Sequence, residues 1–410
     1  MDSDGLTLSA ASSGGNVNLT TTNADLTLSA NTTVGGTLSL TTTGAGNVIL
    51  PAAGFIQSAG LTVNANDLLD ADRELTLAAT SANITLRNAA SSRNWATSFN
   101  DLILALTGSG DFALTDSSAL TLTSATTGGN ASFTTTNADL TLSSNPAVSG
   151  NLSLITTGTG NVIIPQTGLG LPAGLTINAN DLLDTDRTLT LAATDASINL
   201  RGATAAHTWA SSFNTLNLSL TGSADFALVD SNALTLTSVT TSGNASFTTT
   251  NADLTLASNP AVSGNLSLIT TGTGNVIIPL AGLSQAAGLT LNANDVLDTD
   301  RNISLSAGAA SITLRDNSAA RSWATAFTSL NLNLSGSGAF SLTDSDALSL
   351  TAATSGGAVS LTTTGADLTL TTDTSVSGTL SRSCPVRASA AVQTTISGTD
   401  AAAARAAGVV

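Results

Sequence analysis

The chain has 410 residues, of which 9% are charged and 3% aromatic, and its formal net charge is −16 at a sequence pI near 4.1. Because its few cations are all arginines and acids outnumber them, it repels phosphate backbones, and we expect no nucleic-acid partner. It contains no run of about 18 apolar residues, so we expect no transmembrane helix. Its mean hydropathy of +0.28 and evenly spread leucines exclude a disordered chain.

A long internal repeat organises the sequence. The phrase LTLSAASSGGNVNLTTTNADLTLSAN begins at Leu6, and close copies begin at Leu120, Leu234 and Leu348, each 114 residues after the one before. Self-similarity at a fixed period is the signature of a repeat architecture. We therefore predict one solenoid domain over residues 1–381, made of repeat 1 (6–119), repeat 2 (120–233), repeat 3 (234–347) and a partial repeat 4 (348–381).

A shorter rhythm lies inside each repeat. In repeat 1, strand-like segments occupy 6–8, 17–19, 26–28, 38–40 and 48–50, and the turn sequences GGN, TNAD, TVGG and TGAG separate them. Two such strands and two turns make a coil of about 20 residues, so a repeat holds five or six coils. Leucine alternates with threonine or serine, which places the leucines on one buried face. The pattern predicts an all-β fold, a parallel β-helix.

One acidic segment, Asn64 to Arg73, recurs at 178–187 and 292–301. Several carboxylates on one loop offer the oxygen ligands that Ca²⁺ prefers, but the spacing of known calcium motifs is absent. We favour a structural loop, with a calcium site as the alternative. The calcium alternative would use Asp67, Asp70, Asp72, Asp181, Asp184, Asp186, Asp295, Asp298 and Asp300.

Most of the aromatic density falls in one block of each repeat. The block interrupts the strand rhythm, so we expect an excursion packed over the wall of the solenoid, with any helix confined to residues 90–100. Packing is the favoured interpretation, and a carbohydrate- or protein-binding patch is the alternative. The block comprises Trp95, Phe99, Trp209, Phe213, Trp323 and Phe327.

Candidates for catalysis are weak. The single histidine, His207, aligns with Arg93 and Arg321, so this position favours a long polar side chain and not a general base. The repeated body has no cysteine and no zinc-ligand spacing. We expect that the protein is not an enzyme and has no catalytic residue and no cofactor. Identical repeats do not provide the single, unique group of residues that an active site needs.

Both ends suggest a piece of a longer protein. Residues 2–3 align with 116–117, so the sequence begins in the middle of a repeat, and its first residues do not have the pattern of a signal peptide. The pattern fails at Arg382, and residues 382–410 contain three of the eleven arginines and the single cysteine, Cys384. We expect this tail to be disordered, as a frameshifted or fused segment, with a degenerate cap as the alternative.

The coils at 116–142 and 54–66 resemble those of filamentous-haemagglutinin-type exoproteins, bacterial surface proteins of the two-partner-secretion and autotransporter-like kind. The resemblance covers about residues 2–381. It implies a single-stranded, right-handed parallel β-helix that is secreted or held at the bacterial outer membrane, and that acts as an adhesin.

This resemblance and the repeats together predict a non-enzymatic structural and adhesive protein, extracellular or on the cell surface. Its partners would be host or abiotic surfaces, through a carbohydrate or protein receptor, in weak multivalent contacts. Two alternatives stay open: a threonine array that binds ice, and a β-helix enzyme that acts on polysaccharides.

Overall fold

A computed structural model describes residues 2–69, 75–183, 188–297, 303–316, 318–371 and 374–384. Over these ranges the chain contains strands and turns but no helix. It divides into two compact units, residues 1–203 and 204–410, called here the N-terminal half and the C-terminal half.

The N-terminal half holds the first 24 strands. Most have two to six residues, which is short for a globular sheet and typical of a solenoid coil. Their bounds are β1 (Leu6–Leu8), β2 (Ser12–Ser13), β3 (Val17–Thr21), β4 (Leu26–Leu28), β5 (Thr33–Val34), β6 (Leu38–Thr42), β7 (Val48–Ile49), β8 (Phe55–Ile56), β9 (Gly60–Ala65), β10 (Leu68–Leu69), β11 (Thr76–Leu86), β12 (Arg93–Leu106), β13 (Phe112–Asp116), β14 (Leu120–Thr127), β15 (Ala131–Thr135), β16 (Leu140–Leu142), β17 (Ala147–Val148), β18 (Leu152–Thr156), β19 (Val162–Ile163), β20 (Leu169–Gly170), β21 (Leu175–Ala179), β22 (Leu182–Leu183), β23 (Thr188–Ala192) and β24 (Asp195–Leu200).

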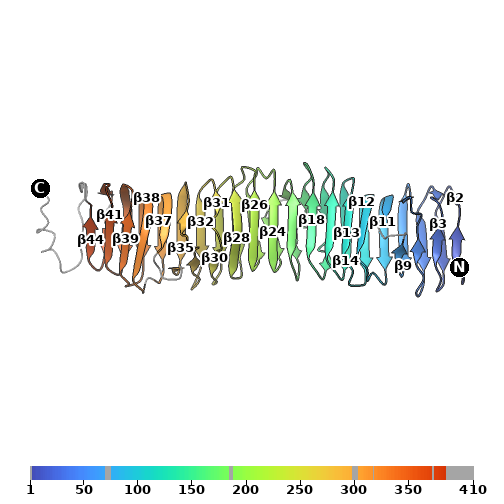
Figure 1. Cartoon of the computed structure of the whole chain (residues 1–410), viewed down its shortest axis with the longest axis horizontal. Coiled ribbons are helices and arrows are strands. Elements are labelled where there is room, and N and C mark those ends of the chain that lie inside the picture. Colours follow the sequence, from blue (N-terminus) through green and yellow to red (C-terminus); the bar gives the residue numbers. More distant parts are fainter. Residues whose placement is uncertain are drawn as a thin grey trace, which may run out of the picture. The chain divides into compact units, whose positions relative to one another are not determined.

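Strands in this half pair in parallel with the strand one coil further on (Figure 1). Leu6 lies beside Leu26, and Val17 beside Leu38, which confirms the predicted coil of about 20 residues. The coil nevertheless has three strands where two were predicted, because short pairs such as β2 with β5 form a further side. The sequence hides this side, since its strands have only two residues and carry no leucine repeat.

The C-terminal half repeats the same parallel pattern, as where Ala245 lies beside Leu266 and Leu266 beside Leu289. The two halves together hold about 18 turns of β-solenoid, so the predicted fold class is confirmed. Its strands are β25 (His207–Ser212), β26 (Thr215–Leu220), β27 (Phe226–Asp230), β28 (Leu234–Thr241), β29 (Ala245–Thr249), β30 (Leu254–Leu256), β31 (Ala261–Val262), β32 (Leu266–Thr270), β33 (Val276–Ile277), β34 (Leu283–Ser284), β35 (Gly288–Ala293), β36 (Val296–Leu297), β37 (Ser304–Leu314), β38 (Arg321–Leu334), β39 (Phe340–Asp344), β40 (Leu348–Ser355), β41 (Val359–Thr363), β42 (Leu368–Leu370), β43 (Thr374–Val376) and β44 (Leu380–Ser383).

The core is a column of aliphatic side chains. Along β18, buried and half-buried residues alternate, so that Leu152 and Leu154 are fully enclosed while Ser153 lies on the outer surface. Each fully buried leucine contributes roughly 1.5–3 kcal/mol, and it gains that burial from the coils on either side. Stability therefore depends on stacking, because a single coil cannot enclose its own leucines.

The predicted end of the solenoid at residue 381 falls inside β44. Arg382 and Ser383 continue the strand and pair with Leu361 and Thr362. The hydrogen bonds between paired strands use backbone groups. Strand pairing can therefore continue for a few residues beyond the end of the repeated side-chain pattern. Residues 385–410, most of the predicted tail, lie outside the described residues.

In each full repeat, two stacked turns each place one residue in the left-handed conformation. Asn137 has φ 54° and Gly158, in the turn stacked beside it, has φ 55°. A Cβ built on Gly158 would lie 2.0 Å from Oδ1 of Asn137. Both the backbone angle and the close approach require glycine there.

We predict that Gly158→Ala lowers the free energy of unfolding by about 1–3 kcal/mol, because alanine adds left-handed strain and displaces the Asn137 amide. Gly170→Ala is the matched control, since a Cβ built on Gly170 would meet no neighbouring atom closer than 3.9 Å and its φ is not positive. Urea unfolding followed by circular dichroism measures both. Equal stability of the two variants would contradict this account of the turn.

Candidate binding surface

All six aromatic side chains predicted as a possible recognition patch are buried. Trp95, Trp209 and Trp323 are each 1% exposed, and the three phenylalanines of the block are 0% exposed. The Trp95 ring meets Phe112 edge to face, with centroids 5.0 Å apart. The rings therefore lie in the core and offer no open face to a ligand, which contradicts a binding patch made of them.

The expected excursion at this block is absent, and residues 90–100 contain no helix. Arg93, Trp95, Thr97 and Phe99 alternate with exposed residues along the 14-residue strand β12. The block is an ordinary strand with large inward side chains. Its period of two was hidden because Arg93 and Thr97 are polar residues at inward positions.

We predict that Trp95→Ala destabilises the protein by about 3–5 kcal/mol, the usual loss for a large buried aromatic side chain. The neighbouring exposed Asn94, replaced by alanine, should change stability by less than about 0.5 kcal/mol. Thermal unfolding of both variants measures the difference. If Trp95→Ala left stability unchanged but weakened attachment of the protein to a surface, the Trp95 ring would have a role in recognition after all.

The first acid of each Asp loop is a structural residue. Asp67 accepts a hydrogen bond from the backbone N–H of Leu68 and forms an ion pair with Arg93. In the C-terminal half, Nε of Arg321 donates to Oδ1 of Asp295 at 2.8 Å, and both side chains are buried. The arginine at this repeat position, Arg93 or Arg321, is thus the counter-ion of the first aspartate of the loop.

Of the remaining calcium candidates, only Asp181 lies within the described ranges. Asp181 is buried and accepts from the N–H of Leu182. Among the described residues, no group of three acid, histidine or cysteine side chains could hold a metal ion. The other candidates, Asp70, Asp72, Asp184, Asp186, Asp298 and Asp300, lie outside the described residues.

We predict that Asp295→Ala lowers stability by about 3–5 kcal/mol, because it leaves the Arg321 charge buried without its partner. Asp346→Ala, at an exposed acid, is the control. Addition of EDTA to the unchanged protein should leave the melting temperature where it was, since removing a ligand bound only by the native state would lower it. A fall of many degrees on chelation would show that the loops hold calcium.

A second buried carboxylate of each full repeat is Asp116, Asp230 or Asp344, each 0% exposed. Oδ2 of Asp116 accepts from Oγ1 of Thr97 at 2.6 Å and from the N–H of Phe99 at 2.8 Å. Oδ1 accepts from the N–H of Ser118 at 2.8 Å. These bonds join two successive coils, so the acid serves the stacking of coils.

Outward side chains form a better contact surface than the aromatic block. In the C-terminal half, one half-exposed hydroxyl per coil lies in register, and we call these residues the hydroxyl row: Ser246, Ser267, Thr290 and Ser311. Parallel strands are about 4.8 Å apart, so the row repeats at that interval. Sequence reasoning predicted outward serine and threonine, but only the register shows that these four form one line.

A ladder of amides borders this row. Oδ1 of Asp225 accepts from the N–H of Asn244 at 2.8 Å, and Oδ1 of Asn244 accepts from the N–H of Asn265 at 2.8 Å. A hollow of about 380 Å³ lies beside them, and its walls include Asn244, Asn265, Ser246 and Ser267. His207 also contributes to the walls but is itself 1% exposed.

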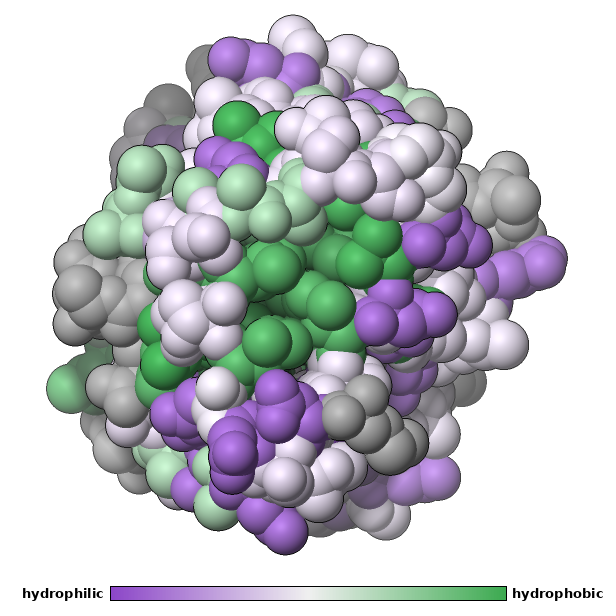
Figure 2. Space-filling view, turned by 90° about the vertical axis from the view of Figure 1, so that its right-hand side faces the viewer, coloured by the Kyte–Doolittle hydropathy of each residue, from purple (hydrophilic) through white to green (hydrophobic). Residues whose placement is uncertain are grey.

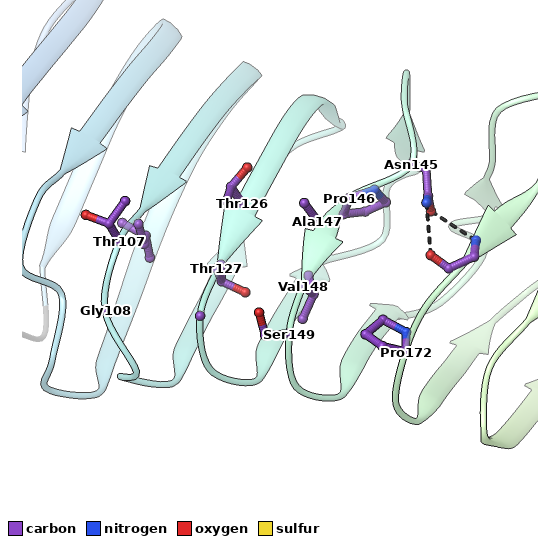
Figure 3. Close-up of a pocket in the computed structure, with 13 residues that line it drawn as sticks. Thr107, Gly108, Thr126, Thr127, Asn145, Pro146, Ala147, Val148, Ser149 and Pro172 are labelled. Atoms are coloured by element: carbon purple, nitrogen blue, oxygen red, sulfur yellow. Dashed lines mark hydrogen bonds between the residues drawn. The ribbon is translucent and has the colours of Figure 1, made fainter.

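The N-terminal half has a larger hollow of about 520 Å³ at the corner of successive coils (Figure 3). Thr107, Thr127 and Ser149 come from neighbouring coils along it, with Pro172 at the far side. The Asn145 amide closes one edge, since it donates to the Gly170 carbonyl at 2.9 Å and accepts from its N–H at 3.1 Å. The lining contains no charged side chain.

Arginines at the turns hold successive coils together and are not available for ligands. Arg87 donates to Oδ1 of Asn64 at 2.6 Å and to the Thr42 carbonyl at 2.7 Å, and so spans several coils. Arg315 makes the same contacts with Asn292 and Thr270. Burial lowers the pKa of the Arg315 guanidinium below its ordinary value.

No family model matches the chain, and neither the curated proteins nor the solved structures contain a match. In the part of the chain that is described, no helix is long and apolar enough to cross a membrane. The parallel β-solenoid agrees with the fold that the resemblance to haemagglutinin-type exoproteins implied.

Proposed function

We propose that this protein is a non-enzymatic structural and adhesive solenoid, secreted or exposed on a bacterial surface. The observation that carries the proposal is the hydroxyl row, a line of neutral polar groups that coil stacking repeats at one residue per coil. Each contact is weak, and a line of them gains strength through multivalency.

The chemistry of this surface favours a glycan-bearing partner. Serine and threonine hydroxyls and the amides of Asn244 and Asn265 both donate and accept hydrogen bonds, as sugar hydroxyls do. The shallow hollow beside the row is bordered by these hydroxyls and amides, although most of its exposed lining is apolar. An abiotic hydroxylated surface would be held by the same groups.

Buried polar residues support a structural role over catalysis. Asp67, Asp295 and Asp116 are bound to neighbouring coils of their own half, and this arrangement recurs in successive repeats. An enzyme needs one differentiated group of residues that stabilises a transition state. The ice-binding alternative requires uniform threonine ranks, whereas the hydroxyl row mixes serine with threonine, and a thermal-hysteresis measurement tests it.

The attachment test replaces the hydroxyl row with four alanines: Ser246→Ala, Ser267→Ala, Thr290→Ala and Ser311→Ala. Alanine is tolerated at half-exposed strand positions, so the fold should persist while attachment of displaying cells to glycan-coated surfaces falls about tenfold. Adherent cells are counted after washing, and circular dichroism confirms folding.

The matched control replaces four other half-exposed hydroxyls of the same half, Thr235, Thr255, Ser349 and Thr369, which lie on β28, β30, β40 and β42. This variant should attach as the unchanged protein does. Equal attachment by both quadruple variants would show that the hydroxyl row is not the adhesive surface.

A further inference from the structure

One inward position differs in kind between the repeats. The interior of a coil is apolar, as the end-on view of the N-terminal half in Figure 2 shows, yet Gln57 in repeat 1 and Gln285 in repeat 3 are only 2% and 3% exposed. Repeat 2 has Leu171 at the equivalent position. Burial of an amide is costly unless the amide is hydrogen-bonded, so the two glutamines need partners in their own coils.

Each glutamine joins two backbone carbonyls of the preceding coil. Nε2 of Gln57 donates to the Val34 carbonyl at 3.0 Å and to the Gly36 carbonyl at 2.7 Å. Nε2 of Gln285 donates in the same way to the equivalent carbonyls of repeat 3. The hydroxyl of the exposed Ser58 also donates to the Val34 carbonyl, at 3.4 Å, so this oxygen can be reached from the outer surface.

Repeat 2 lacks both kinds of donor. Leu171 replaces the glutamine and Pro172 replaces Ser58, and neither side chain can donate a hydrogen bond. The equivalent carbonyls belong to Val148 and Gly150, and among the described residues no donor forms a hydrogen bond with either of them. Val148 is 3% exposed, and a buried carbonyl without a donor is rare. Repeat 2 therefore retains two acceptors but not the amide that they bind elsewhere in the chain.

These acceptors belong to the wall region of the 520 Å³ hollow in Figure 3, called here the repeat 2 hollow. Val148 and Pro172 line it from neighbouring coils, and Gly170 adds no side chain to it. Repeat 3 has Ser284 and Ala286 at the positions of Gly170 and Pro172. The remaining lining residues are the same in the two repeats, except that a serine in repeat 3 replaces Gly128. The exchange at residues 170–172 is thus the main feature that distinguishes this hollow from the same place in repeat 3.

The lining favours a neutral ligand that carries an amide. It contains no charged side chain, and most of its exposed surface is apolar, with the hydroxyls of Thr107, Thr127 and Ser149 along it. An acetamido group offers an N–H for the Val148 carbonyl and a methyl group for the apolar wall at Pro172. The hydroxyls of a sugar ring can bond to the threonine and serine hydroxyls. The volume also suits a small ligand, since such sites measure about 300–1,000 Å³.

We propose that the repeat 2 hollow is a binding site for a neutral acetamido sugar. The sugar supplies the amide donor that repeats 1 and 3 supply from Gln57 and Gln285. The inference rests on the proposed function only for the class of partner, a glycan, and it uses no residue of the hydroxyl row.

The first test compares two disaccharides on the full chain by ligand-observed NMR titration. N,N′-diacetylchitobiose carries acetamido groups, and cellobiose has the same linked rings with hydroxyls in their place. Cellobiose should bind at least about tenfold more weakly, because it cannot donate an amide N–H to the Val148 carbonyl. Equal binding of the two sugars, or no binding of either, would overturn the proposal.

A closed variant gives repeat 2 the residues of repeat 3: Gly170→Ser, Leu171→Gln and Pro172→Ala. The chain then supplies its own amide to the two carbonyls, so binding of diacetylchitobiose should fall at least about tenfold. The three residues occur together at the equivalent place in repeat 3, so the fold should persist, and circular dichroism confirms it. Unchanged binding by the folded closed variant would contradict the assignment of this site.

The reverse exchange supplies a gain of binding. In the closed variant, Ser284→Gly, Gln285→Leu and Ala286→Pro open the same place in repeat 3, and binding of diacetylchitobiose should return. A folded protein that still does not bind would count against the proposal.

The hydroxyl-row variant separates this site from the adhesive surface. It should bind diacetylchitobiose as the unchanged protein does, even though attachment of displaying cells falls. If the row variant lost the disaccharide and the closed variant kept it, this inference would fail and the proposed function would stand. If only the closed variant lost the disaccharide and the row variant attached normally, the site would stand and the adhesive row would fail.

Discussion

In-register parallel stacking is the constraint on which the rest of this structure depends. Each coil places a residue beside its counterpart about 20 positions away, as Leu6 beside Leu26 and Ala245 beside Leu266. Inward positions then become continuous apolar columns, and outward positions become lines of like side chains. The core and the hydroxyl row both follow from this single register.

Buried polar groups pin the register in each repeat. Asp116 accepts bonds from Thr97 and Phe99 of the preceding coil, and Arg321 pairs with Asp295 across coils. A slip by one residue would leave these charges buried without partners, at a cost far above that of a misplaced leucine. Leucine columns supply most of the stability, while these groups select one alignment out of many similar ones.

The sequence predicted the fold well, because the 114-residue period and the alternation of leucine with threonine depend on local pattern alone. It failed at β12, where Arg93 and Thr97 are inward residues whose partners, Asp67 and Asp116, lie 26 and 19 residues away. It left a binding patch at Trp95 open as the alternative to packing, since burial by neighbouring coils cannot be read from one segment. The hydroxyl row could not be identified from the sequence, because it depends on which residues pair between coils. Two-residue strands and bulges change that register in ways the sequence pattern does not show.

The most direct test of in-register stacking is a distance between outward residues of successive coils. Nitroxide spin labels are placed at Thr62 and Asn83, which pair in register on β9 and β11, in a chain with Cys384→Ser. Parallel partners are about 5 Å apart, so the doubly labelled protein should show strong spin–spin broadening that neither single label shows. A double-label spectrum equal to the sum of the two single-label spectra would contradict the account.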